Sequence, residues 1–164
     1  MRVELRWPLA DAPAPAGAPR AVVVDTNIVL DLLVFADPAT AALRQLLQAG
    51  DLRWVATQPM RDELERVLDY PQIAPRLVFY GLTVAAVLQT VDAQVQWRAV
   101  PARAPATCRD ADDQKFIDLA VAERAVLLSK DKAVMALRKR LHAYGAQVGS
   151  ALVAAPAVAS AGTV

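Results

Sequence analysis

Cysteine and histidine are almost absent from the 164-residue chain, which holds only Cys108 and His142. One cysteine excludes an intrachain disulfide, and one cysteine with one histidine is too few for a Cys/His zinc site. A single histidine also argues against a Ser-His-Asp catalytic triad. A lone thiol is typical of proteins from a reducing compartment, so we expect a cytoplasmic protein.

The chain also has little net charge and no long apolar run. Lys and Arg number 18 against 17 Asp and Glu, which gives a net charge of +1. This balance predicts no general basic surface for nucleic acid, although a local basic rim is compatible with it. No uninterrupted apolar run reaches the ~18 residues of a membrane-spanning helix, and the first residues lack the apolar core of a signal peptide. We therefore expect no membrane partner.

Proline and alanine are concentrated near the two ends of the sequence. Residues 8–19 read PLADAPAPAGAP, and residues 150–164 read SALVAAPAVASAGTV. Such low-complexity stretches lack the pattern of a core-forming element. We predict an N-terminal extension at residues 1–20, one domain at 21–152 and an Ala-rich tail at 153–164. The domain is long enough to bury a core of its own.

Strand-like and helix-like patterns alternate within the predicted domain. The expected strands are 22–24, 52–57, 125–129 and 146–151, and the expected helices are 28–35, 39–49, 58–68, 83–95, 111–124 and 132–142. Strands separated by helices of this length form a mostly parallel sheet that is covered on both faces. The fold class predicted from the pattern is therefore α/β.

Acidic residues follow two of the expected strands. Asp25 comes directly after VVV. Asp131 follows the stretch VLLS, which ends at Ser129, with Lys130 between them. Ligands of parallel sheets bind at the carboxyl ends of the strands, so these positions mark a candidate site. Each acid alone also has an ordinary explanation, because Asp between a strand and a helix is a common N-cap. For Asp25, capping the next helix and holding a charged group both stay open.

Two further acids lie in expected helices. At about 100° per residue, Asp113 points into the apolar stripe of helix 111–124, and Glu63 borders the stripe of helix 58–68. A carboxylate at the margin of a core needs a partner, because burying an unpaired charge is costly. Asp110, three residues before Asp113, has the position of an N-cap.

Convergence of these carboxylates would require a cation. Their mutual repulsion is relieved by a hard divalent ion, and ligand sets made only of oxygen favour Mg²⁺, with Mn²⁺ as an alternative. Such an ion can activate water and neutralise charge on a phosphodiester. This pattern predicts hydrolysis without a covalent intermediate, in keeping with the scarcity of Cys and His.

Three stretches, VVVDTNIVL, MRDELERVLDYP and CRDADDQKFIDLAVAERAVLLSKD, together resemble a PIN domain, most closely the bacterial group of toxin–antitoxin components. The resemblance covers residues 21–150. It implies a three-layer α/β/α fold with a mostly parallel central sheet. It further implies a VapC-like, Mg²⁺-dependent endoribonuclease that leaves 5′-phosphate and 3′-hydroxyl ends, is restrained by a small protein antitoxin and often forms a homodimer.

The resemblance also assigns residues to the site. The catalytic and metal-binding acids carried over by motif are Asp25, Glu63, Asp113 and Asp131. Asn27, in the DTN motif, would order the loop around Asp25. Ser129 would bond to the metal shell, and Asp110 would assist through water. The cations expected to contact RNA phosphates are Arg109, Lys115, Lys130 and Lys132. Their alternative role is to balance nearby carboxylates at the surface.

Three other protein classes offer different interpretations of the same acids. A phosphotransferase of the haloacid-dehalogenase type needs a second acid two residues after the first, where this chain has Asn27. A receiver domain needs an acidic pair near the end of its first strand, which the sequence does not show. The alternative from a different class is a non-catalytic PIN-like module that binds RNA or a partner protein. It predicts that the acids are caps and surface groups that do not converge.

Overall fold

The computed structural model of the chain describes residues 2–9 and 19–154 and is built around a five-stranded parallel sheet. The strand order is β4-β3-β2-β5-β6. The bounds of these strands are β2 (Arg20–Val24), β3 (Leu52–Ala56), β4 (Gln96–Trp97), β5 (Val126–Leu128) and β6 (Gln147–Gly149). Every residue of β2 and β5 is buried, as expected for the central strands of a sheet covered on both faces.

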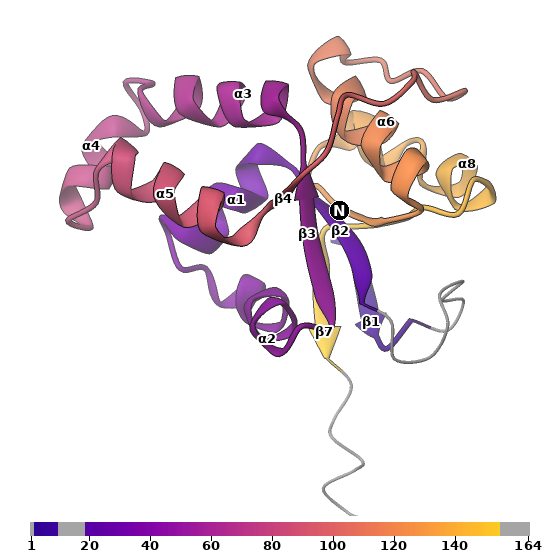
Figure 1. Cartoon of the computed structure of the whole chain (residues 1–164), viewed down its shortest axis with the longest axis horizontal. Helices are drawn as coiled ribbons and strands as arrows, with labels where there is room; N and C mark the ends of the chain where they lie inside the picture. The colour runs from indigo at the N-terminus through magenta and orange to yellow at the C-terminus, as the bar shows by residue number, and fades with distance from the viewer. Residues whose placement is uncertain (1, 10–18, 155–164) are drawn as a thin grey trace, which may run out of the picture.

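Helices cover the two faces of this sheet, which gives three layers (Figure 1). On one side lie α1 (Thr26–Leu33), α3 (Gln58–Leu68), α4 (Ala74–Phe79) and α5 (Val84–Gln94). On the other side lie α6 (Gln114–Glu123) and α8 (Arg138–Ala143). A further helix, α2 (Ala41–Ala49), packs against β3. The expectation of an α/β fold with a mostly parallel central sheet is confirmed.

A second, two-stranded sheet joins segments from far apart in the sequence. β1 (Glu4–Trp7) pairs in parallel with β7 (Ala151–Ala154), with Glu4 opposite Ala151. Gly149 makes room for this pairing, because a Cβ there would lie 2.6 Å from Cγ of Leu5. Residues 4–7 thus pack on the domain, although the sequence assigned them to an extension. Residues 10–18 of that extension and the tail beyond residue 154 lie outside the described residues, and the domain boundaries stay a prediction.

Two helical segments differ from the expected pattern. The expected helix at 132–142 is divided into α7 (Lys132–Met135) and α8 by a turn at Leu137, whose ψ is 3°. Helix α4 follows Pro71 in a stretch that carried no helix prediction. Local propensity does not explain the break at Leu137, since Ala136 and Leu137 are good helix formers on their own.

In the part of the chain that the structure describes, no single helix has the length and hydropathy to span a membrane. Among residues 2–9 and 19–154, one pair of helical segments, α1 and Pro38–Ala49, reaches those limits when taken together, and that pair is bent by 103°.

Stability should depend most on the central strands. Val126 in β5 is fully buried, so Val126→Ala should lower the free energy of unfolding by about 2 kcal/mol through lost burial and the cavity left behind. The matched control is Val78→Ala at a position that is 79% exposed, where the change should stay within ~0.5 kcal/mol. Urea denaturation followed by circular dichroism measures both. Equal losses in the two variants would contradict this assignment of the core.

Candidate functional site

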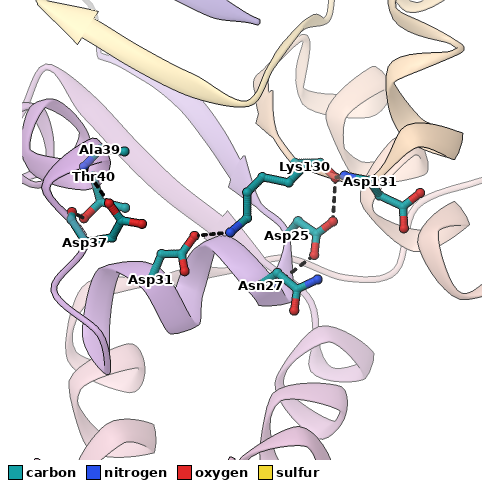
Figure 2. Close-up of polar contacts among 9 residues, drawn as sticks. Asp25, Asn27, Asp31, Asp37, Ala39, Thr40, Lys130 and Asp131 are labelled. Carbon is teal, nitrogen blue, oxygen red and sulfur yellow. Dashed lines mark hydrogen bonds and ion pairs between the residues drawn. The ribbon is translucent and has the colours of Figure 1, made fainter. Parts of the chain in front are cut away.

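The two strands at the centre of the sheet end side by side. Val24 of β2 pairs with Leu128 of β5, and the amide N–H of Asp25 donates to the carbonyl of Leu128 over 2.9 Å. Because the strands are parallel, Asp25 and the turn that carries Asp131 leave the sheet at the same edge (Figure 2). The strand-end convergence expected from the sequence is therefore present for this pair.

Asp25 both caps a helix and faces the site. Its Oδ1 accepts the backbone N–H of Asn27 over 3.1 Å, which caps α1, and its Oδ2 accepts the hydroxyl of Ser129 over 2.6 Å. Burial raises the pKa of Asp25, the hydrogen bonds from Ser129 and Asn27 oppose that rise, and the charges of Glu63 and Asp131 add to it. The carboxylate is thus held in place by the fold while lying near other negative groups.

Three further carboxylates form a compact group, which we term the acidic cluster: Asp110, Asp113 and Asp131. One oxygen from each lies within 4.8 Å of the others. Asp110 accepts the N–H of Asp112 over 3.0 Å and so caps the short 3-10 helix Ala111–Asp113, which confirms its predicted role as a cap. Asp131 caps α7 by accepting the N–H of Ala133 over 2.7 Å.

Asp113 is the most constrained member of the acidic cluster. It is 8% exposed, and its Oδ2 is buried without a hydrogen-bond partner in the described part of the chain. Burial raises the pKa of Asp113 to about 7, and the charges of Asp25 and Asp131, a hydrogen bond between the carboxyl groups of Asp113 and Asp131, and the charge of Asp110 add to the rise. Its inward orientation, expected from the helical wheel, is confirmed.

The donor set fits a hard divalent cation. The acidic cluster presents only carboxylate oxygens, and one of them is a buried atom that no protein donor reaches. Mg²⁺ and Mn²⁺ prefer such ligands, and a cation there would relieve the repulsion that raises the pKa of Asp113. Asp110, Asp113 and Asp131 are therefore the residues best placed to hold an ion, with Asp25 beside them.

Glu63 differs from the other acids of the site in its hydrogen bonds. Its Oε1 accepts the ammonium of Lys115 over 2.7 Å, and its Oε2 accepts the hydroxyl of Thr26. The negative charge of Glu63 is among the causes that raise the pKa of Asp25, so the two carboxylates are electrostatic neighbours. Both oxygens of Glu63 nevertheless have protein partners.

Of the four cations expected to contact RNA, two are engaged in ion pairs with acidic side chains. Lys115 lies inside the site, on Glu63, and Lys130 pairs with Asp31 over 2.6 Å (Figure 2). Arg109 and Lys132 are exposed. The side chain of Asn27 is also exposed, so its contact with Asp25 is made by its backbone N–H.

Sequence reasoning missed the residues that hold the loop before the acidic cluster. The amide of Gln114 donates to the carbonyl of Ala106 and accepts the N–H of Cys108, over 2.9 and 2.7 Å. Gln114 also donates to Asp118, which accepts the N–H of Ala104. A signal was present in the sequence, since Gln114 and Asp118 are polar residues four apart and therefore neighbours on one face of the helix. Thr26, which holds Glu63, was missed as well.

Comparison with known proteins bears directly on this arrangement. A family profile described as PIN domain matches residues 21–133, which is more than half of the chain and includes β3, β4, β5, most of β2, the acidic cluster, Asp25 and Glu63. The chain belongs to the PIN domain family. PIN domains have a nuclease-type fold, are generally nucleases acting on nucleic acid, and typically bind divalent metal ions. No curated protein matches the chain.

The raised pKa of Asp113 makes the stability of this PIN domain depend on pH. A folded-state pKa of about 7, above the ordinary value of 3.8 for Asp, means that the folded protein binds the extra proton, so metal-free stability falls as pH rises from about 4 to 7. Asp113→Asn should remove roughly 2–4 kcal/mol of that fall. Urea denaturation in EDTA at pH 5 and pH 8 measures the difference.

The matched control for this measurement is Asp112→Asn, at the exposed neighbour of Asp113. It should keep the wild-type dependence on pH. An Asp113→Asn variant whose stability falls between pH 5 and pH 8 as much as that of the wild type would show that Asp113 does not carry the effect.

Proposed function

We propose that this PIN domain is a Mg²⁺-dependent endoribonuclease that hydrolyses RNA phosphodiesters, with Mn²⁺ able to replace Mg²⁺. The observation that carries the proposal is the buried Oδ2 of Asp113, which lies without a partner within the acidic cluster. A carboxylate in that state is costly to maintain unless it has a ligand to bind. The family supplies the reaction class, since PIN domain nucleases act on RNA and other nucleic acids.

The residues divide into two roles under this proposal. Asp110, Asp113 and Asp131 would hold the ion, which supplies water activation and neutralises negative charge on the phosphate when it is bound. Asp25 faces the same space and is the group best placed to orient or accept a proton from the attacking water, because its pKa is raised by burial. Ser129 and the N–H of Asn27 fix the direction of that carboxylate.

Substrate contacts would come from exposed cations near the acids. Arg109 precedes Asp110, and Lys132 follows Asp131. Both side chains are exposed next to members of the acidic cluster. Phosphate contacts from such residues position the RNA without reading its sequence. With a net charge of +1, the chain should bind RNA with modest affinity that weakens as salt increases.

A toxin role with a small protein antitoxin is the finer form of the proposal. It is supported by the sequence resemblance and by apolar side chains at the end of α4, where Val78 and Phe79 are both 79% exposed beside Tyr80. Exposed apolar groups that lie together are typical of protein contacts. The alternative function, a non-catalytic module that binds RNA or a partner protein, would use the same surfaces but needs no ion at the acidic cluster.

A cleavage assay separates these functions. Wild-type protein should cut a fluorogenic RNA in Mg²⁺ and leave 5′-phosphate and 3′-hydroxyl ends, and EDTA should abolish the signal. Asp113→Asn and Asp25→Asn should each reduce the rate by about 100-fold or more, because they remove charge from the proposed ion site and from the group beside it. Cleavage that is unchanged by EDTA and by both substitutions would overturn the metal-dependent mechanism.

Ser129 provides a test of the support for Asp25. Ser129→Ala removes the hydroxyl that donates to Asp25 and accepts the N–H of Asp131, so the affinity for Mn²⁺ should fall by about 10-fold. Isothermal titration calorimetry measures the affinity. Ser150→Ala is the matched control, since that hydroxyl bonds to the backbone of Val3 and not to the site. Equal affinities in all three proteins would show that Ser129 does not support the ion site.

A further inference from the structure

We infer that the site takes one divalent ion, not two, and that the ammonium of Lys115 supplies the second positive charge, on Glu63. The inference rests on the proposed metal-dependent function and specifies how the cations are distributed within the site. Under this inference Lys115 positions Glu63 within the candidate site and does not contact an RNA phosphate at its rim.

Apart from Asp25, whose oxygens accept the N–H of Asn27 and the hydroxyl of Ser129, the carboxylates of the site fall into two groups. Asp110, Asp113 and Asp131 have oxygens within 4.8 Å of one another, and the buried Oδ2 of Asp113 has no partner among the described residues. Glu63 is not part of this group. Its two oxygens are occupied by the ammonium of Lys115 and the hydroxyl of Thr26. One group therefore offers oxygens to an ion, and the other already has its donors.

Lys115 is held from several directions. Its Nζ donates to Oε1 of Glu63 over 2.7 Å and to the carbonyl of Asp112, and it lies 5.1 Å from the centre of the Phe116 ring. The Lys115 and Glu63 side chains are 23% and 18% exposed. By contrast, Lys130, in its ion pair with Asp31, is 51% exposed. Lys115 is thus a fixed cation, whereas Lys130 has the exposure of a surface group.

The position of Lys115 on Glu63 limits the number of divalent ions that the site can hold, for electrostatic reasons. A second divalent ion on Glu63 would have to displace an ammonium that already bonds to that carboxylate, or sit beside it against the repulsion of two positive charges. An ammonium neutralises charge as a compact donor and has no open coordination positions. Lys115 therefore fixes Glu63 beside Asp25 without providing a second metal centre.

The test is the number of Mn²⁺ ions bound per chain, counted on the full chain by electron paramagnetic resonance and by calorimetry. Wild type should bind one ion. Lys115→Met removes the ammonium and frees an oxygen of Glu63 next to Asp25, so this variant should bind two. Adding Glu63→Gln to Lys115→Met should return the number to one. Lys139→Met, on the exposed side of α8, is the matched control and should bind one ion.

The outcomes separate this inference from the function on which it rests. Wild type that binds no Mn²⁺ would overturn the proposed metal-dependent function itself. Wild type that binds two ions, or Lys115→Met that folds and still binds one, would overturn the role of Lys115 alone. If circular dichroism shows that Lys115→Met does not fold, Lys115→Gln replaces it with the same expected count of two. Lys115→Arg, which keeps the charge, should bind one.

Discussion

The repulsion among carboxylates at the carboxyl edge of the sheet is the constraint on which the rest of the site depends. Three of these acids are tied to the start of a helix or 3-10 turn: Asp25 caps α1, Asp110 caps the turn before α6, and Asp131 caps α7. Backbone N–H groups at helix starts stabilise negative charge. The fold therefore supplies local compensation for most of the charge, and leaves Asp113, which makes no such capping bond, as the acid with a buried oxygen that has no protein partner among the described residues.

Capping a helix and facing the candidate site are consequently not alternatives for Asp25. At Asp25 one oxygen serves the helix and the other is held by Ser129, so the same side chain ends a strand, begins a helix and faces the site. Asn can keep the capping contact while losing the charge. The structural and electrostatic contributions of these positions are thus separable by chemistry, although they reside in one residue.

Much of this arrangement could be predicted from local patterns, because strand ends, caps and helical faces are encoded within a few residues. Asp25 and Asp131 follow buried strands, and the period of helix 111–124 turned Asp113 inward, as the structure has it. What sequence could not show depends on the reach of side chains and on distant pairing. Lys115 was expected at the rim but extends to Glu63, which is 52 residues away. The loop held by Gln114 was missed for a similar reason.

The sheet formed by β1 and β7 has a mechanical consequence for the whole domain. Its strands come from opposite ends of the described chain and pair with each other, so this sheet joins the two ends of the domain (Figure 1). Neither strand can keep its ladder if the other detaches, since each supplies the only strand partner of the other within the described residues. Truncation that removes β1 should therefore destabilise β7, and truncation that removes β7 should destabilise β1.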